Sequence, residues 1–516
     1  MRFLRERRPA SPKRDQREGG LPSRPARGIL PVLLLVVVLA APDSVATDRW
    51  DSIRAQIRQT MAGANLPSIS VAVAHGGKII WEESFGWADR DKKIAATPQT
   101  MYSLASISKP ITATGLMALV ERGAIDLDKP ANDYLGTGKL TGLAGDATGA
   151  TVRRVLSHTA GLPLHYQFYY STNDYRPTSN DETIARYGIL VNPPGDVYEY
   201  SNLGFGILDH LTARVSGMDY ADYLRTQVFI PLGMTRTSVG IAPGLEPYAA
   251  QRYDSRQQPI PFYDFDHRGG SAVYSSARDL VRFGMFHLKD HLSDQGAILT
   301  DETIDLMHQP VAPAPYGLGW GVTADDNGYL RYSHTGGMPG VATVLNLYPA
   351  EHLAVVVLTN ASGGNIGRIA NEIAATVLPK YAETRQQRTS QPASPPGPVA
   401  AFKPTAELVG EWSGTIRTWE GEVPLTLTVP PDGNVHVQMG AEHRTQLNQV
   451  SWRGNNLRGR FSGTMPTSDA RRWPHSVLLN LRLRAGTLSG MATAQTTAEP
   501  IFFALTSFAS LKKAGP

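Results

Sequence analysis

The chain has 516 residues, of which 41% are hydrophobic and 19% charged, a globular composition too long for one ordinary domain. The absence of cysteine excludes a cysteine nucleophile, a cysteine-ligated metal site and a disulfide framework. Residues 1–46 hold nine basic and four acidic residues, a net charge of +5, so the total of +4 leaves −1 for residues 47–516. A near-neutral main body gives no indication of nucleic-acid binding.

The first segment is typical of an export signal. Residues 1–28 are basic and are followed by an apolar run of 13 residues, 29–41. Such a run is short for a membrane span but suits the hydrophobic part of a signal peptide. We therefore expect residues 1–46 to be a signal peptide cleaved after Ala46, and the protein to be periplasmic or secreted. The alternatives are an uncleaved membrane anchor and a buried helix.

Residues 47–380 are predicted to form one mixed α/β domain. Two apolar, β-branched runs flank Gly76-Gly77 and indicate a hairpin: Ile69–Ala74 and Ile79–Phe85. A helix is predicted from about Ser106 to Glu121, where Leu116, Leu119 and Val120 have helical spacing. The middle, about 150–290, has a mostly helical pattern with glycine and proline breaks. Strand patterns return at Thr343–Tyr348 and Leu353–Leu358.

Residues 381–405 are predicted to be a proline-rich linker, and residues 406–516 a small all-β domain. Apolar residues alternate with others over Val423–Val429 and Val477–Leu483, and Pro430–Gly433 has the composition of a turn. Period-two alternation between turns indicates antiparallel strands with one buried face. We expect a β-barrel or sandwich whose core includes the four tryptophans Trp412, Trp419, Trp452 and Trp473.

Ser106-Ile107-Ser108-Lys109 is the first motif that can carry chemistry. A serine hydroxyl becomes a good nucleophile only when a base removes its proton. Residues three apart on a helix share a face, so the amine of Lys109 can lie beside the Ser106 hydroxyl. Lysine acts as a base only when it is neutral, which requires burial or a nearby positive charge. A Ser-x-x-Lys spacing also occurs by chance.

Tyr200-Ser201-Asn202 is the second motif, on a predicted loop before a helix around Phe205–Val215. A phenol can relay protons if a neighbouring cation lowers its pKa. The Asn202 amide offers a donor and an acceptor to a polar substrate. The alternative interpretation is an ordinary helix cap with a packed tyrosine.

His334-Thr335-Gly336-Gly337 is the third motif, just before the predicted strand Thr343–Tyr348. Two glycines allow the backbone to approach a ligand closely and expose its N–H groups. One such N–H can pair with that of the nucleophile to form an oxyanion hole. A plain hairpin turn is the alternative.

The order of these motifs resembles that of the class C β-lactamases and the related penicillin-binding-protein-like esterases and D-peptidases. This family carries Ser-x-x-Lys, then Tyr-x-Asn, then Lys-or-His-Thr-Gly. The resemblance covers about residues 50–380. It extends to further blocks: Ser157–Leu162, Pro194-Gly195, Pro231–Met234, Gly269–Asp279, Tyr316–Trp320 and Val355–Asn360.

The resemblance implies a β-lactamase-like α/β (α+β) fold, with an antiparallel sheet flanked by helices and a helical subdomain that carries Tyr200. It implies that Ser106 is the acylated nucleophile and that Lys109 shares a proton with Ser106 and Tyr200. Tyr200 would assist acylation and activate the deacylating water. Asn202 would bind a substrate amide, and the N–H groups of Gly337 and Ser106 would form the oxyanion hole.

Position 334 departs from the class C β-lactamases, in which it is lysine. His334 and Thr335 would line the substrate site, but a histidine is mostly neutral near pH 7. Its grip on an antibiotic's carboxylate should be weaker than that of a lysine. The sequence therefore favours an ester or D-amino-acid amide substrate over a penicillin.

Three histidines outside these motifs are further candidates for a functional role. His287 and His291 are four apart on a predicted helix, a spacing that can bind a metal, but a solvated or capping role is the commoner explanation. His158 is expected to have a structural role in the core or beside the site. We expect neither a metal nor a cofactor.

The sequence thus predicts an exported serine hydrolase that acts through an acyl-serine intermediate on a small-molecule or peptide substrate. Transfer of the acyl group to an amine or alcohol instead of water stays open, since both share the acyl-enzyme. A non-catalytic protein that binds peptidoglycan or another partner, through the same cleft or the β-domain, is the alternative. The aromatic-rich segment Leu164–Thr183 suggests an apolar or ring-bearing substrate, although packing of these side chains is commoner.

Overall fold

The structure is a computed structural model that describes residues 48–381, 402–496 and 501–514. The predicted signal peptide, 1–46, and most of the predicted linker, 381–405, lie outside the described residues. Within the described ranges, the helices are all too short or too polar to cross a membrane.

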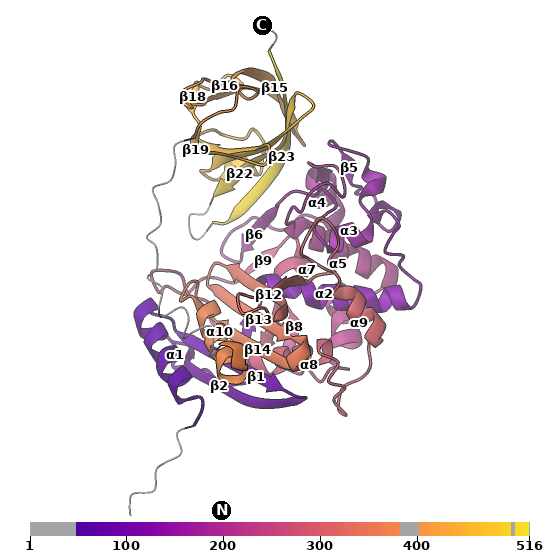
Figure 1. Cartoon of the computed structure of the whole chain (residues 1–516), viewed down its shortest axis with the longest axis vertical. Helices are drawn as coiled ribbons and strands as arrows, with labels where there is room; N and C mark the ends of the chain where they lie inside the picture. The colour runs from indigo at the N-terminus through magenta and orange to yellow at the C-terminus, as the bar shows by residue number, and fades with distance from the viewer. Residues whose placement is uncertain (1–47, 382–401, 497–500, 515–516) are drawn as a thin grey trace, which may run out of the picture. The chain divides into compact units, whose positions relative to one another are not determined.

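A seven-stranded antiparallel sheet lies at the centre of the region before residue 380 (Figure 1). Its order is β11-β12-β13-β14-β1-β2-β3. The strands are β1 (Ser68–His75), β2 (Lys78–Asp89), β3 (Ile94–Ala95), β11 (Gly321–Ala324), β12 (Leu330–Met338), β13 (Val341–Tyr348) and β14 (Leu353–Thr359). The turn at Gly76-Gly77 joins β1 to β2 in the expected hairpin, with His75 opposite Lys78.

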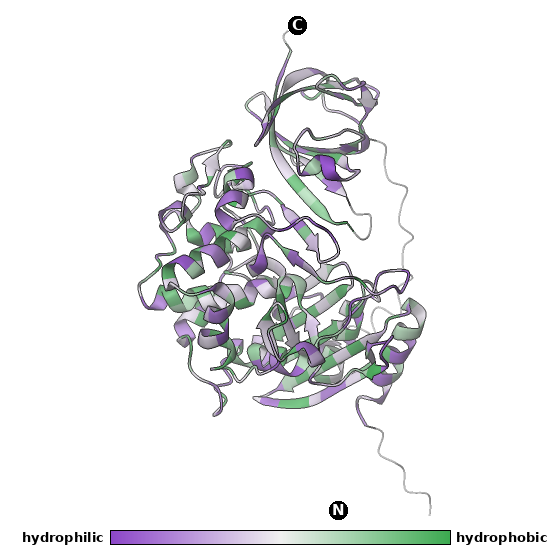
Figure 2. Cartoon of the chain, turned by 180° about the vertical axis from the view of Figure 1, so that it is seen from behind, coloured by the Kyte–Doolittle hydropathy of each residue, from purple (hydrophilic) through white to green (hydrophobic). Residues whose placement is uncertain are grey.

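Helices cover both faces of this sheet. Helices α1 (Asp51–Ala64) and α10 (Ile366–Val377) pack on one face, and α8 (Ala277–His287) packs on the other. Alternate residues of β1 serve the two faces: Val71 and Val73 belong to the α1/α10 core, and Ala72 and Ala74 to the α8 core. Figure 2 shows the hydrophobic colour concentrated along the central strands, whereas the helices carry both colours.

A mostly helical subdomain surrounds α2 (Ser108–Glu121), which is buried from Ser108 to Leu119. The other helices of this subdomain are α3 (Val152–Leu156), α4 (Asn180–Tyr187), α5 (Asn202–Ser216), α6 (Tyr220–Leu224) and α7 (Arg268–Ser271). Helix α9 (Asp301–Met307) follows α8 in the chain. Short strands interrupt this part more often than the sequence indicated. They are β4 (Met101–Ser103), β5 (Thr141–Gly142), β6 (Tyr166–Tyr170), β7 (Ile189–Leu190), β8 (Thr237–Val239), β9 (Tyr263–Phe265) and β10 (Val273–Ser276).

The C-terminal sheet region, Gly410–Lys513, consists of antiparallel strands in the order β18-β17-β16-β15-β23-β22-β21-β20-β19. Its strands are β15 (Gly410–Thr418), β16 (Gly421–Val429), β17 (His436–Met439), β18 (Thr445–Gln446), β19 (Asn448–Arg453), β20 (Asn456–Phe461), β21 (Ser476–Arg484), β22 (Thr487–Thr496) and β23 (Phe503–Lys513). Strands β18 and β19 lie at opposite ends of this order, yet only Leu447 separates them in the chain. The sheet must therefore curl until its ends meet, which makes a nearly closed barrel and not a sandwich (Figure 1).

The predicted alternation is realised in this region. In β21, Val477, Leu479, Leu481 and Leu483 are buried, and the residues between them are half-buried. The tryptophans differ from the expectation of a shared core. Trp412 is buried and Trp419 and Trp452 are half-buried, but Trp473 is 37% exposed because it follows a short turn outside the strands.

Candidate active site

Ser106 and Lys109 lie together at the start of α2. A 3₁₀ turn, Ala105–Ile107, carries Ser106, and α2 begins two residues later than the sequence suggested. The Lys109 Nζ and Ser106 Oγ atoms are hydrogen-bonded at 3.1 Å, as the three-residue spacing predicts. Ser106 is partly exposed, whereas Lys109 is fully buried. The hydroxyl is therefore open to a substrate and the amine is shielded from water.

The surroundings of Lys109 favour a neutral amine. Its Nζ also donates to Asn202 Oδ1 at 2.8 Å and to the Gly270 carbonyl at 2.9 Å, and these partners are all uncharged. The Tyr200 ring centroid lies 4.8 Å from Nζ. Burial lowers the pKa of Lys109 well below its usual range. A neutral amine has two N–H groups for Asn202 and Gly270, which leaves its lone pair for the Ser106 hydroxyl.

Tyr200 and Asn202 lie at the start of α5, as predicted. Ser201 caps this helix, since its Oγ accepts a hydrogen bond from the Gly204 amide at 2.9 Å. Asn202 is the first residue of the helix, so its side chain reaches Lys109. The condition of a lowered phenol pKa is not met. Burial raises the pKa of Tyr200, and its hydrogen bond with Ser106 offsets only part of this effect.

The His334–Gly337 motif lies inside strand β12 and not in a turn before a strand. Its side chains alternate, with His334 and Gly336 buried and Thr335 and Gly337 exposed. An added Cβ at Gly336 would lie 2.1 Å from the Leu104 carbonyl oxygen. Only glycine at this position allows β12 to approach the turn that carries Ser106.

A second contact holds the sheet close to the turn that carries Ser106. The hydroxyl of Thr343, in the neighbouring strand β13, donates to the Leu104 carbonyl at 2.9 Å. An added Cβ at Gly337 would meet open space, so this glycine is not required for packing. An exposed glycine on a strand that passes close to Ser106 is compatible with the predicted oxyanion hole.

His334 is buried, with partners on both ring nitrogens. Its Nδ1 lies 2.8 Å from the Thr335 carbonyl, which can only accept, so Nδ1 carries the proton. Its Nε2 lies 2.9 Å from the Tyr316 hydroxyl, which then donates. Burial, with a contribution from Lys109, lowers the pKa of His334 to about 3. The ring is thus a neutral residue that is already engaged, and its direct contact with substrate stays a prediction.

His158 packs behind Tyr200, with 4.3 Å between the ring centroids. Its Nδ1 accepts the Ser201 amide at 3.1 Å, so the imidazole fixes the backbone next to Tyr200. Its Nε2 is buried and has no hydrogen-bond partner among the described residues, so the ring is only half satisfied. Burial lowers the pKa of His158 well below its usual range, so this imidazole is neutral at neutral pH.

Two residues near the site have left-handed backbone conformations. Ala105, directly before Ser106, has φ 48°, and His158 has φ 59°. Such conformations in residues other than glycine cost about 1–3 kcal/mol and cluster at functional sites.

The sequence did not single out Gly270 or Tyr316, which contact Lys109 and His334. Both lie in blocks of the family resemblance, and no spacing or periodicity marks them.

The metal spacing of His287 and His291 is not realised. Helix α8 ends at His287, and His291 lies beyond it in a left-handed turn, so the two do not share a helix face. His287 is buried and hydrogen-bonded to Thr114 Oγ1 at 2.9 Å, which corrects the expected solvated or capping role. The part of the chain described here contains no group of three or more histidine, aspartate or glutamate side chains arranged to hold a metal ion.

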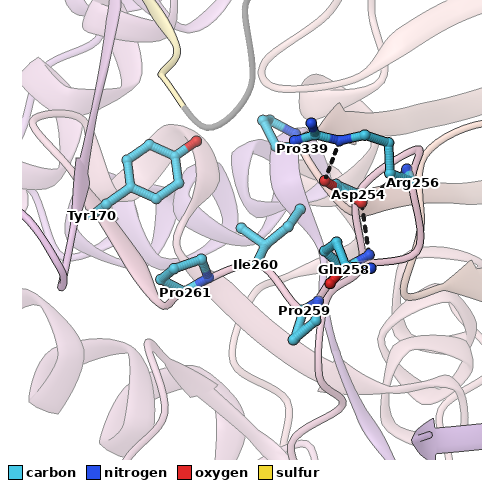
Figure 3. A pocket seen from close by; sticks show the side chains of 8 residues that line it. All are labelled: Tyr170, Asp254, Arg256, Gln258, Pro259, Ile260, Pro261 and Pro339. Carbon is cyan, nitrogen blue, oxygen red and sulfur yellow. Dashed lines mark hydrogen bonds and ion pairs between the residues drawn. The ribbon is translucent and has the colours of Figure 1, made fainter. Parts of the chain in front are cut away.

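A cavity of about 200 Å³ opens beyond the end of β12. Figure 3 shows Ile260 at its centre, between the Tyr170 ring and the ion pair of Arg256 with Asp254. Its remaining walls are Gln258, Pro259, Pro261 and Pro339. Tyr170 of the Leu164–Thr183 segment thus lines this cavity, whereas Phe168 stacks on Tyr263 inside the fold.

The matches to known proteins agree with this geometry. A family model described as Beta-lactamase matches residues 53–378, more than half of the chain. The chain belongs to the β-lactamase family. This family is one of serine hydrolases, and the partly exposed serine beside a buried lysine has the form of a nucleophile and its base.

Two curated relatives show how far the family likeness extends. Penicillin-binding protein 4* of Bacillus subtilis (strain 168) is 27% identical over 323 residues, which cover 56% of this chain and 67% of that protein. Unguisins hydrolase ungD' of Aspergillus campestris (strain IBT 28561) is 28% identical over 326 residues, which cover 59% of this chain and 60% of that protein.

Solved structures share the fold at low identity. SurE is 20% identical with a TM-score of 0.58, covering 90% of this chain and 99% of that chain. A class C β-lactamase is 19% identical with a TM-score of 0.54, covering 63% of this chain and 96% of that chain. The SurE match is too long to end at residue 378, so part of the C-terminal sheet region has a counterpart in that fold.

Proposed function

We propose that this protein is an exported serine hydrolase that forms an acyl-enzyme on Ser106 and cleaves an ester or a D-amino-acid amide. One observation carries the proposal. The Lys109 amine is fully buried, has only uncharged hydrogen-bond partners and lies 3.1 Å from the partly exposed Ser106 hydroxyl.

Acylation follows from this arrangement. The neutral amine of Lys109 accepts the Ser106 proton while Oγ attacks the substrate carbonyl carbon. Negative charge then develops on the carbonyl oxygen, and the N–H groups of Ser106 and Gly337 stabilise it. The carbon–oxygen or carbon–nitrogen bond breaks, and the leaving group takes up the proton. The acyl group stays on Oγ.

Tyr200 serves as a proton relay that acts from its protonated form, so this role needs no lowered phenol pKa. Burial raises the pKa of Tyr200 and keeps the phenol protonated, and its ring centroid lies 4.8 Å from Lys109 Nζ, which supports a role beside the leaving group. It can donate to the leaving group as Lys109 holds the serine proton. In deacylation the same path runs in reverse, and the attacking water loses its proton through Tyr200 and Lys109.

Two features favour an uncharged or weakly polar substrate over a penicillin. His334 has a pKa of about 3, so position 334 carries no cation for a carboxylate. The cavity beyond β12 has Ile260 and three prolines, which suit an apolar substituent, next to the Asp254–Arg256 ion pair and Gln258. Pro339 lies two residues after Gly337, at most about 7 Å along an extended chain, which supports a cavity within reach of a carbonyl bound at Gly337.

The proposal is tested by intact mass after treatment with a fluorophosphonate. We expect one adduct on the wild-type protein and none on Ser106→Ala. Ser108→Ala is the matched control, because Ser108 lies in the same motif but is fully buried and accepts a hydrogen bond from the Val273 amide. It should keep the adduct. Loss of the adduct in Ser108→Ala but not in Ser106→Ala would contradict the assignment, as would a wild-type protein that does not react.

A penicillin in a parallel reaction separates the substrate classes. We expect slow or no acylation, since no cation replaces the lysine of class C β-lactamases at position 334. A rapidly formed adduct, lost in Ser106→Ala, would move the proposal to a penicillin-binding peptidase. Export is tested separately by the N-terminal sequence of protein recovered outside the cytoplasm, which we expect to begin at Thr47.

A further inference from the structure

A buried ionic cluster lies beside the proposed active site. Asp266 accepts hydrogen bonds from His165 Nε2 and His267 Nδ1, each at 2.6 Å, and a longer one from the Gln167 amide at 3.3 Å. The side chains of Asp266, His165 and His267 are almost completely buried. None of the three belongs to the motifs of the proposed reaction. A buried charge held by two imidazoles is costly unless its partners stay in place.

The cluster reaches Lys109 through α7. His267 directly precedes this helix, and its carbonyl accepts the Gly270 amide at 2.9 Å. The Gly270 carbonyl in turn accepts from Lys109 Nζ at 2.9 Å. A Cβ added at Gly270 would lie 3.2 Å from His267 Cδ2 and 3.5 Å from Lys109 Nζ. His267 therefore contacts Gly270, and Gly270 contacts Lys109. A displacement of His267 would move the Gly270 carbonyl, which accepts a hydrogen bond from the Lys109 amine.

The same cluster is held from the C-terminal sheet region by strand pairing. Strand β6 lies between β9 and β23, with Gln167 opposite Phe503 and Phe168 opposite Phe265. Strand β9 ends directly before Asp266. Strand β23 thus extends a small sheet whose other two strands flank the cluster.

Side chains reinforce this pairing around His165. Thr506, in β23, donates from its hydroxyl to the Leu164 carbonyl at 2.6 Å. The Tyr187 ring packs against His165 at a tilt, with 4.3 Å between ring centroids, and its hydroxyl donates to Asp469 of the C-terminal sheet region. His165 is therefore fixed on two sides by contacts that depend on this region.

We propose that the C-terminal sheet region is a positioning element of the active site, acting through the His165–Asp266–His267 cluster and the Gly270 carbonyl on Lys109. Asp266 and Thr506 are then positioning residues. The inference rests on the proposed function, because its effect is on acylation of Ser106. A misplacement of about 1 Å far from the reacting atoms can cost about 100-fold in rate.

The test measures fluorophosphonate labelling of the full-length chain, resolved into kinact and KI. We expect Asp266→Asn to lower kinact about 10- to 100-fold with KI within about twofold, because the residue positions the base without contacting the reagent. Asn keeps the size of the side chain but loses the charge and one acceptor. Asp279→Asn is the matched control: Asp279 is also buried, accepts from the Arg236 amide and the Thr237 hydroxyl, and should keep the wild-type kinact.

A second pair of variants tests the link from the C-terminal region. Thr506→Val removes the donor to Leu164, and we expect kinact to fall about 3- to 10-fold for the loss of one hydrogen bond. Thr506→Ser keeps the hydroxyl and should retain kinact. Thr493→Val is a further control, because the buried Thr493 hydroxyl is hydrogen-bonded to the Thr506 hydroxyl at 3.0 Å and not to the Leu164 carbonyl. This set decides the question even if Asp266→Asn does not fold.

The outcomes separate this inference from the proposed function. A labelled wild-type protein whose Asp266→Asn and Thr506→Val variants both keep kinact overturns the inference alone. So does an equal loss in Asp279→Asn or Thr493→Val, which would indicate general destabilisation. A fall in Asp266→Asn without one in Thr506→Val overturns the role of the C-terminal region. A wild-type protein that is not labelled overturns both.

Discussion

The start of α2 and strand β21 differ in the kind of residue that they bury. In β21 every second residue is apolar and buried, and Leu479 and Leu481 are fully enclosed. At the start of α2 the fully buried residues include Lys109, which has only uncharged partners, and the residue before Ser106 is an alanine at φ 48°. Strand β21 thus follows the local rules of folding. The start of α2 departs from them twice within five residues, with a buried amine and a left-handed alanine.

This difference indicates where the molecule uses stability for reactivity. A buried amine and a left-handed alanine both raise the free energy of the folded state. They persist when the surrounding structure determines them, and such departures from local rules concentrate at functional sites. Substitutions should therefore have opposite consequences in the two regions, on reactivity at α2 and on stability in β21.

The largest expected effect is that of Lys109→Met. Loss of the base should slow fluorophosphonate labelling of Ser106 about 10²- to 10⁴-fold. Methionine has a similar length and no charge to bury, but it leaves Asn202 Oδ1 and the Gly270 carbonyl without their donor, so the free energy of unfolding should change little. Labelling rates and urea titration measure the two quantities. A variant that labels at the wild-type rate would remove Lys109 from the mechanism.

Leu479→Ala should give the opposite result. Deletion of this buried side chain should lower the free energy of unfolding by about 2–5 kcal/mol. The labelling rate of the folded fraction should not change, because Leu479 lies inside the barrel-like sheet. Leu478→Ala is the matched control on the other, half-buried face of the same strand, and it should cost clearly less. Equal costs for the two leucines would contradict the register of β21.

The rate of labelling at the start of α2 should depend on pH. Labelling needs the neutral amine of Lys109, so the rate should fall about tenfold per pH unit below the pKa of Lys109 in the folded protein. The titratable groups around this amine are Tyr200, His158, His267 and His334. Burial raises the pKa of the phenol and lowers those of the imidazoles.

Stability should follow the same group with a definite sign. The pKa of Lys109 is lowered on folding from 10.5, so between the folded value and 10.5 the unfolded chain binds one more proton. Stability therefore rises with pH in this window and is lower on its acidic side. Relative to Lys109→Met, the wild-type protein should gain up to about 1.4 kcal/mol per pH unit. Parallel curves for the two proteins would show that Lys109 is not buried as a neutral amine.

The comparison also shows what the sequence can and cannot predict. Local spacing predicted the contact between Ser106 and Lys109, and alternation predicted the buried face of β21, because both depend on neighbours in the chain. The bond from Lys109 to Gly270 joins residues 161 positions apart, and no local pattern encodes it. The role of Asp266 depends on pairing between β6, β9 and β23, which only the folded chain brings together.

Burial or exposure decides several properties that the sequence leaves open. The sequence shows that His334 and Tyr200 are titratable but not that both lie in low-dielectric surroundings. Burial holds the imidazole neutral and the phenol protonated. Trp473 was expected in a core because tryptophan is apolar, yet its place after a short turn leaves it 37% exposed. Residue type gives an average tendency, and the neighbours in space decide the individual case.

The smallest expected effect separates strain from reactivity. Ala105 and Ala485 are both alanines in left-handed conformations, with φ 48° before Ser106 and φ 43° in the turn between β21 and β22. Glycine relieves the steric cost of about 1–2 kcal/mol but enlarges the unfolded ensemble by about 0.4–1 kcal/mol. Ala105→Gly and Ala485→Gly should therefore both shift the free energy of unfolding upward, by about 0–1.6 kcal/mol.

Only one of the two should change the reaction. Glycine at position 105 loosens the turn that holds the Ser106 hydroxyl beside Lys109, so labelling should slow about threefold, whereas Ala485→Gly should label at the wild-type rate. Urea titration and labelling rates for the two variants measure both effects. Ala105→Gly could instead gain stability and keep the full labelling rate. The left-handed alanine would then be a cost of the local packing against Gly336 and not a means of orienting the nucleophile. The contrast between α2 and β21 would in that case depend on Lys109 alone.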